Sequence, residues 1–104
     1  MNEASRPHDQ TVIELLREDP SLADVYLATT LEEVNEPGGQ FALLAALRQI
    51  AEAHGMANVA ESAGIKRETL DRALSPKGNP TIKTLLAVAN AIGLQLSVHR
   101  QEVA

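Results

Sequence analysis

The sequence contains no cysteine and almost no aromatic residues. Among its 104 residues there is no tryptophan, and the only aromatic side chains are Tyr26 and Phe41. The absence of cysteine excludes a disulfide framework and a thiolate metal site. With so few rings, the chain lacks the aromatic platform on which single-stranded nucleic acids stack. The core must therefore be aliphatic, and leucine and alanine dominate the 44% of hydrophobic residues, which favours helices.

Long hydrophobic runs are also missing. The longest run, from Phe41 to Leu47, is too short to span a bilayer. The first residues lack the cationic start and apolar block of a signal peptide, so we expect a cytoplasmic protein without a membrane partner. A chain of 104 residues predicts one domain with a modest core.

Familiar catalytic and metal-binding patterns are absent too. The three histidines, His8, His54 and His99, lie far apart, and neither HxxxH nor HExxH occurs. The sequence has no GxSxG nucleophile motif and no phosphate-cradling GxxxxGK[ST] motif. We therefore predict no catalytic residue, no metal site and no cofactor, and we expect a protein that is not an enzyme.

Positive charge is scarce overall, but it is concentrated in one half of the chain. The net charge is −5, yet residues 1–54 hold three basic and ten acidic side chains, whereas residues 55–104 hold six and four. The two halves thus carry −7 and +2. This split favours a C-terminal half that faces DNA and an acidic N-terminal half that meets a basic protein. The alternative is chance variation in charge between the halves.

The stretch from Met56 to Ser75 has the pattern of a helix-turn-helix. Asn58 can cap a first helix through its side-chain oxygen. Gly64 suits the turn, where a left-handed backbone is easiest without a Cβ atom. Leu70 and Leu74 then recur at helical spacing and give a second helix a buried face.

The opposite face of that second helix supplies the predicted DNA-binding side chains. Arg67 and Arg72 are candidates for guanine, because a guanidinium can bond O6 and N7 together. Thr69 is a candidate for a thymine methyl group or a phosphate, and the lysines are expected at phosphates. The alternative is an ordinary helical hairpin with a solvated charged face. The predicted set is Asn58, Lys66, Arg67, Glu68, Thr69, Arg72, Lys77 and Lys83.

Periodicity and capping signals predict the other helices. We expect frayed residues at 1–8 and a first helix opened by a capping box at Thr11. Further helices are predicted at residues 20–34 and 40–54, and a last one follows a cap at Thr81.

A Pro-Gly-Gly loop at residues 36–39 divides the chain. Residues 1–39 form an N-terminal arm of two short helices, and residues 40–104 form the DNA-binding domain.

The segment from Leu94 to His99 alternates apolar and polar residues, the period of a strand. A lone strand cannot satisfy its main-chain groups, and no second strand is evident. The simplest partner is the same strand of another copy, paired about a twofold axis. We therefore predict a homodimer held through Leu94, Leu96 and Val98. The alternative is a segment that folds back irregularly on its own core.

The helix predicted at residues 20–34 has two apolar stripes where one would suffice to pack on the core. A spare stripe suits a protein partner, and the surrounding carboxylates would steer a basic one. The alternative is that both stripes are buried. One stripe is Leu22, Val25 and Thr29, and the spare stripe assigned to the partner is Leu27, Leu31 and Val34.

Together these segments resemble a known family. Residues 40–98 resemble the lambda-repressor-like (Xre) helix-turn-helix domains, and LSPKGNPTIKTLLAVANAIGL is the most distinctive block of a likeness to HigA-like antitoxins, the addiction-module antidote proteins. The similarity extends upstream through LLREDPSLADVYLATTLEE. It implies a dimer that binds its operator and has a RelE-type ribonuclease toxin as partner. Many relatives cap the recognition helix with Ser or Thr where this chain has Lys66, which has no side-chain acceptor.

The sequence therefore predicts an all-α protein, with a lambda-repressor-like helix-turn-helix domain, an N-terminal helical extension and a short C-terminal strand. We expect a transcriptional repressor that binds double-stranded operator DNA, the antitoxin of a HigBA-like operon, which neutralises a basic RelE-type toxin. Two alternatives stay open. One is a stand-alone Xre-type regulator with no toxin, and the other is a protein-interaction module whose helix-turn-helix does not touch DNA.

Overall fold

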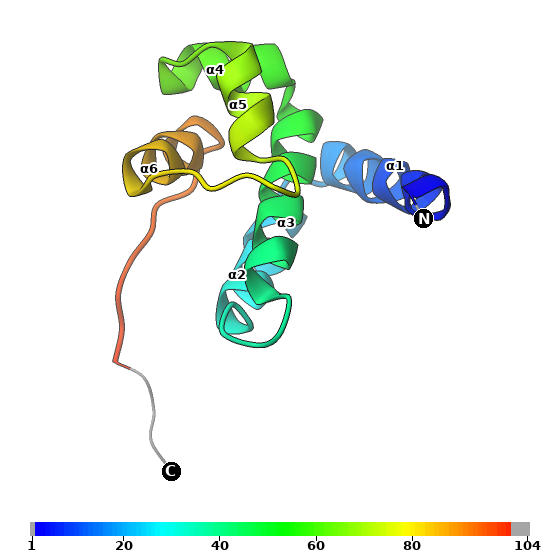
Figure 1. The fold of residues 1–104 in the computed structure, drawn as a ribbon, viewed down its shortest axis with the longest axis horizontal. Helices are drawn as coiled ribbons and strands as arrows, with labels where there is room; N and C mark the ends of the chain where they lie inside the picture. Colours follow the sequence, from blue (N-terminus) through cyan, green and yellow to red (C-terminus); the bar gives the residue numbers. More distant parts are fainter. Residues whose placement is uncertain (1, 101–104) are drawn as a thin grey trace.

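The computed structural model describes residues 2–100, with side chains from His8 onward, as helices joined by irregular segments (Figure 1). The helices are α1 (Asn2–Glu18), α2 (Leu22–Glu32), α3 (Gly39–His54), α4 (Met56–Ala63), α5 (Arg67–Ala73) and α6 (Ile82–Ala91). Residues 2–100 include no strand, so the predicted all-α class is confirmed. None of these helices combines the length and the hydropathy needed to cross a membrane.

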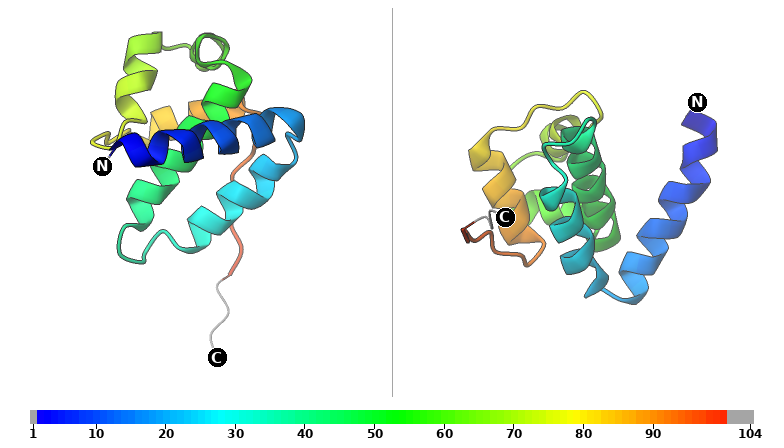
Figure 2. Two further views of the ribbon diagram at one scale, coloured as in Figure 1. Left: turned by 90° about the vertical axis from the view of Figure 1, so that its right-hand side faces the viewer. Right: turned by 90° about the horizontal axis from the view of Figure 1, so that it is seen from below.

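Helix α3 occupies the middle of the molecule. It packs against α1 and α2 on one side and leads into α4, which in turn packs against α5 and α6. Figures 1 and 2 agree that α4 and α5 lie at one end, while α2 lies alongside α3 away from them. Helix α3 therefore lies between the acidic arm and the basic half and contacts both.

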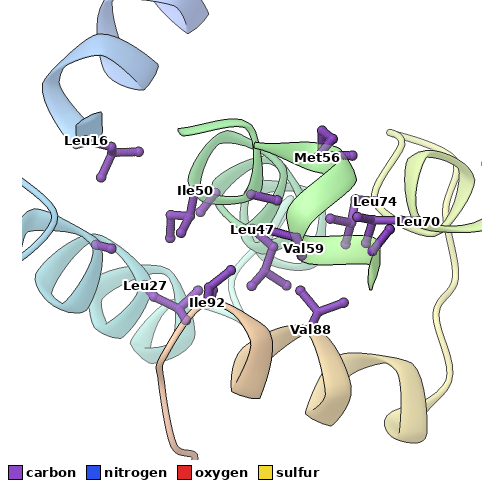
Figure 3. Packing of buried hydrophobic residues seen from close by; sticks show 14 residues of the cluster. Leu16, Leu27, Leu47, Ile50, Met56, Val59, Leu70, Leu74, Val88 and Ile92 are labelled. Atoms are coloured by element: carbon purple, nitrogen blue, oxygen red, sulfur yellow. The ribbon is translucent and has the colours of Figure 1, made fainter. Parts of the chain in front are cut away.

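One aliphatic core runs through all six helices (Figure 3). The arm takes part in it, because Leu16 of α1 and Leu27 of α2 are each only 5% exposed and belong to the same cluster as the deepest residues. Leucine, isoleucine and valine fill most of the core in place of aromatic side chains, as expected. The six helices contribute, in order, Leu16, Leu27, Ile50, Val59, Leu70 and Val88.

Helix α1 is longer than the sequence predicts. It continues upstream of Thr11, so the predicted start at Thr11 and the predicted fraying of residues 2–8 are wrong, while Met1 lies outside the described residues. Asp9 explains the turn just before Thr11, because its carboxylate is held by Arg48 and Gln49 of α3. The capping box at Thr11 predicts that the helix starts there. Tertiary contacts outweigh this local signal, so the helix begins upstream of it.

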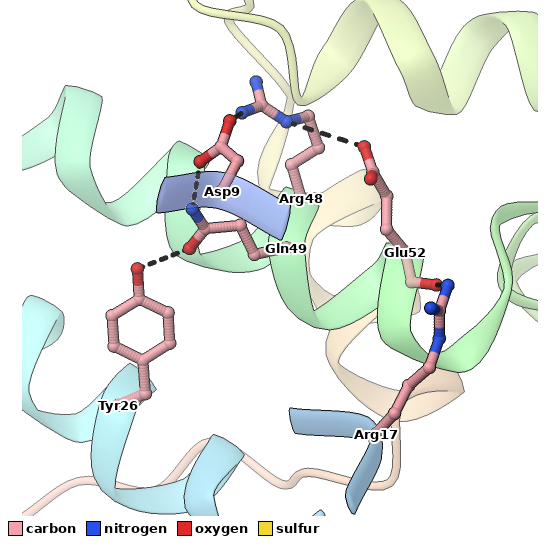
Figure 4. Close-up of polar contacts among 6 residues, drawn as sticks. All are labelled: Asp9, Arg17, Tyr26, Arg48, Gln49 and Glu52. Carbon is pink, nitrogen blue, oxygen red and sulfur yellow. Dashed lines mark hydrogen bonds and ion pairs between the residues drawn. The ribbon is translucent and has the colours of Figure 1, made fainter. Parts of the chain in front are cut away.

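A chain of polar contacts attaches the arm to α3 (Figure 4). Gln49, 3% exposed, donates from its side-chain amide to Asp9 and accepts a hydrogen bond from the hydroxyl of Tyr26 on α2. Arg48 Nη2 lies 3.2 Å from Asp9 Oδ2, and Arg48 Nε lies 3.8 Å from Glu52 Oε2. Burial raises the pKa of Tyr26, the nearby Asp9 carboxylate raises it further, and Arg48 lowers it. These contacts fix the positions of α1 and α2 relative to α3.

The predicted C-terminal strand is wrong. Residues 94–100 are irregular, and the main chain of residues 95–100 makes no hydrogen bond with the rest of the described chain. An isolated chain offers this segment no strand to pair with, so alternation alone does not produce a ladder. Leu94 packs on the core and its N–H donates to Ala89 O at 2.9 Å, whereas Leu96 is 45% exposed and Val98 is 97% exposed.

Candidate nucleic-acid interface

Helices α4 and α5 are joined by a tight turn, as predicted. Gly64 has φ +75°, the left-handed conformation expected there, and its N–H donates to Glu61 O at 3.1 Å. The N–H of Ile65 donates to Ala60 O at 3.0 Å, which closes the end of α4. The backbone then becomes extended at Lys66, which precedes α5 and makes no side-chain capping bond. This turn fixes the direction in which α5 leaves α4.

The predicted capping role of Asn58 is wrong. Helix α4 begins two residues earlier, at Met56, and Gly55 precedes it. Asn58 therefore lies in the first turn of the helix, where its Nδ2 donates to His54 O at 3.4 Å. Gly55, with φ +100°, both ends α3 and precedes α4, so it occupies the cap position that was predicted for Asn58. Asn58 is exposed and can still face a ligand near the N-terminus of α4.

Helix α5 is buried on one face only. Leu70 and Leu74 are completely buried, as the helical spacing predicts, and anchor the helix on the core. Most of the residues between and before them are exposed, and the surface that these exposed residues form is called the α5 face below. It consists of Lys66, Arg67, Glu68, Thr69, Asp71 and Arg72.

Among the described residues, the cations of the α5 face have no acidic partner. The ion pairs within the described residues both use Arg48, in the other half of the chain. Glu68 lies four residues before Arg72, a spacing that often pairs charges on a helix, yet no ion pair forms there. The guanidinium groups of Arg67 and Arg72 are therefore left available to an external anion or base edge.

A hollow of about 330 Å³ lies between α5 and the start of α6. It brings together three predicted DNA-binding residues, Thr69, Arg72 and Lys77. Gly78 makes this closeness possible, because a Cβ atom at this position would lie 2.1 Å from Ala73 O. Lys83, in the first turn of α6, is exposed but does not line the hollow.

Residues at the start of α6 also line this hollow, and the sequence did not predict them as DNA-binding residues. Asn79, Thr81 and Thr84 line it alongside Arg72. Thr81 confirms its predicted cap, since its Oγ1 accepts from the N–H of Thr84 at 3.1 Å. The Asn-Pro-Thr sequence at residues 79–81 indicates the cap of α6. It does not indicate that residues 75–80 approach α5 closely, because that approach depends on Gly78 and on packing.

The side chains of the α5 face are of types that bind nucleic acids. Exposed lysines and arginines match phosphates, and an arginine or threonine on an exposed helix face can reach base edges. No cluster of three or more histidine, aspartate or glutamate side chains suited to a metal exists within the described residues.

Of the residues predicted to bind a protein partner, Leu27 and Leu31 line one groove, whereas Val34 lies beyond the end of α2. Leu27 is only 5% exposed and also belongs to the core. Leu31 is 40% exposed, while Leu22 and Val25 of the other predicted stripe are 40% and 66% exposed. The free apolar side of the N-terminal part of α2 is therefore the one that carries Leu22 and Val25.

Comparison with known proteins identifies relatives along nearly the whole chain. The family profile described as "Probable addiction module antidote protein" matches residues 9–100. An uncharacterized protein of Haemophilus influenzae (strain ATCC 51907 / DSM 11121 / KW20 / Rd) is 41% identical over 80 residues, which cover 77% of this chain and 78% of that protein. No solved structure matches the chain.

Proposed function

The chain belongs to the family of probable addiction module antidote proteins, and we propose that it is the DNA-binding antitoxin of a HigBA-like toxin–antitoxin pair. In this proposal it acts by binding alone. Its C-terminal half is a lambda-repressor-like (Xre) helix-turn-helix that represses its own operon as a homodimer. Its N-terminal half neutralises a RelE-type toxin.

The α5 face carries the DNA-binding part of the proposal. Helix α5 enters the major groove, where Arg67 and Arg72 contact base edges and Thr69 contacts a thymine methyl group or a phosphate. Lys66, Lys77 and Lys83 neutralise phosphates on either side. The observation that supports this assignment is that these cations are exposed and make no ion pair with the described residues.

The toxin-binding part rests on the family and on the charge of the N-terminal half. An antidote requires a toxin, and residues 1–54 carry three basic and ten acidic side chains. The exposed Leu22 and Val25 are close in sequence to the exposed carboxylates of Glu18, Asp19 and Asp24. A ribonuclease that holds RNA is basic, so in this proposal the carboxylates steer it and Leu22 and Val25 make the apolar contact.

Salt dependence tests the DNA-binding part. Operator affinity, measured by fluorescence anisotropy, should fall steeply as salt is raised, because bound phosphates release counterions. Lys77→Ala should reduce the slope of log K against log salt by about 1, the contribution of one phosphate contact. Arg17→Ala, on α1, is the matched control and should leave the slope unchanged. An unchanged slope for Lys77→Ala would remove Lys77 from the interface.

Growth rescue tests the toxin-binding part. The neighbouring open reading frame is expressed together with wild-type protein or with Val25→Lys, which removes an apolar contact and adds a charge that repels a basic toxin. We expect protection by the wild type and loss of protection by Val25→Lys, while Ser62→Lys, at an exposed position of α4, adds the same charge elsewhere and still protects. A harmless neighbour would contradict the antitoxin role, and full protection by Val25→Lys would move the toxin contact off this part of α2.

A further inference from the structure

A shallow apolar groove lies between α2, α3 and α6, away from the α5 face. Its walls are leucines and one alanine of those helices, and the lining includes no charged residue. Leu31 stands at the rim from α2 and Leu85 borders it from α6. The irregular residues 94–100 are called the C-terminal segment here. Leu96 of this segment also lines the groove, so the segment borders it.

The C-terminal segment itself is unusually apolar for an exposed stretch. Val98 is 97% exposed and Leu96 is 45% exposed, and polar residues alternate with these apolar ones in the sequence. The main chain of residues 95–100 makes no hydrogen bond with the described part of the chain. Figures 1 and 2 show the segment running away from α4 and α5. Val98 is almost fully exposed, so it packs on no apolar surface of the described chain.

The groove and the segment match each other in chemistry. An uncharged aliphatic groove cannot use the electrostatic attraction that a basic toxin or DNA would bring. It does fit an aliphatic side chain on an extended segment whose main chain is unpaired, and this chain carries such a segment at its own C-terminal end. A twofold axis would give each copy the same contact, groove to segment and segment to groove.

We propose that a second copy of this chain covers the groove and inserts Val98 of its C-terminal segment between α2 and α6. This proposal rests on the homodimer in the proposed function and names the surface that holds it. It replaces the strand pairing predicted from the sequence with a reciprocal contact between segment and groove. The α5 faces stay free, because the groove shares no lining residue with the hollow at Arg72 or with the α5 face.

Site-directed crosslinking tests the contact. The natural chain has no cysteine, so any disulfide reports introduced thiols. Tagged L31C and untagged V98C are mixed and oxidised with copper–phenanthroline, which accepts the two electrons released as two thiols form one disulfide. We expect mixed L31C–V98C dimers to form about tenfold faster or more than mixed dimers of V25C and V98C, because a bound segment has a high effective concentration at the groove. Equal rates for both mixtures, or V98C dimers alone, would overturn the proposal.

Sedimentation of the full chain supplies the second measurement. Val98→Asp leaves the core untouched, since the side chain is 97% exposed, and should weaken self-association about tenfold or more through loss of apolar burial at two symmetric contacts. Val25→Asp, the matched control, should sediment like the wild type. A wild-type monomer would overturn both this proposal and the homodimer in the proposed function. A dimer that Val98→Asp and Leu31→Asp both leave intact would overturn this proposal alone.

Discussion

The two halves of this molecule use charge in opposite ways. In the first half, from α1 to α3, Arg48 reaches Asp9 at 3.2 Å and Glu52 at 3.8 Å, so its charge is used within the fold. In the second half, from α4 to α6, Arg67 and Arg72 make no ion pair within the described residues. Side chains of one type therefore hold helices together in one region and stay unpaired on the surface in the other, within the described residues.

The halves also differ in how their helices are anchored. Helix α5 is held by Leu70 and Leu74, both fully buried and apolar. The arm has apolar anchors too, but it is aligned by Gln49, a buried polar side chain that bonds to α1 and to α2. A buried polar group is costly unless paired, so it favours the one arrangement that satisfies it. We infer that the apolar contacts supply most of the stability and the polar chain selects the alignment of the arm.

The strongest way to break the first half is to remove Gln49. Gln49→Ala leaves the Tyr26 hydroxyl without its acceptor, takes a hydrogen bond from Asp9 and opens a small cavity in α3. We expect the free energy of unfolding to fall by about 3 kcal/mol. Urea denaturation gives the value, and Gln40→Ala, an exposed glutamine on the same helix, should stay within about 0.5 kcal/mol of the wild type. A small loss for Gln49→Ala would mean that the polar chain contributes little to the fold.

Replacing one arginine in each half with alanine tests whether the two halves use these charges differently. Arg72→Ala should cost about 2 kcal/mol of binding on the cognate operator and less on random DNA, while changing stability by under about 0.5 kcal/mol. Arg48→Ala should do the reverse, lowering stability and leaving DNA affinity unchanged, because Arg48 contacts Asp9 and Glu52 of its own chain. Gel shifts and urea denaturation on both variants give the four values. Equal losses on cognate and random DNA would show that Arg72 reads no base.

The sequence predicted best what is determined locally. Gly64 at the turn, Thr81 as a cap, and the burial of Leu70 and Leu74 all follow from spacing and residue type, and all are confirmed. Each depends on neighbours within a few residues, which periodicity and capping patterns capture. The residues of the α5 face stay a prediction as DNA contacts, although their exposure agrees with it.

The sequence predicted least well what depends on distant partners. The start of α1 was misplaced because Asp9 is fixed by residues 39 and 40 positions away. Gln49 sits in an otherwise apolar stripe of α3, and a lone polar residue there does not reveal which side chains satisfy it. The strand at residues 94–99 was wrong because alternation shows only that a segment can pair, while pairing needs a second strand. The hollow at Arg72 likewise depends on the close approach at Gly78.

Removing a cap in the second half should have a moderate effect. Thr81→Ala deletes the acceptor of the Thr84 N–H at the start of α6, and we expect a loss of about 1 kcal/mol of stability. Thr29→Ala in α2 is the matched control. Its hydroxyl bonds only to Val25 O within its own helix, so stability should change by under about 0.5 kcal/mol. Thermal denaturation of the two variants compares them, and equal changes would show that the Thr81 bond is not a stabilising cap.

The smallest expected effect is the pH dependence contributed by Tyr26. Its pKa is raised above 10.0 by burial first and by Asp9 second, against the lowering effect of Arg48. Since the folded pKa exceeds the unfolded one, the contribution is complete below pH 10.0 and is lost as pH rises through the folded pKa. The stability difference between wild type and Tyr26→Phe should therefore shrink in alkaline solution.

Tyr26 is the only tyrosine and the chain has no tryptophan, so phenolate absorbance titrates this one group. We expect a pKa above 10.0 in the wild type. Asp9→Asn should lower it, because the carboxylate no longer opposes the phenolate, but should not return it to 10.0, because burial between α2 and α3 remains. If Asp9→Asn removed the whole shift, then α2 would have moved away from Gln49, and the alignment of the arm would depend on Asp9 itself. A wild-type pKa at or below 10.0 would instead contradict the burial of Tyr26 between α2 and α3.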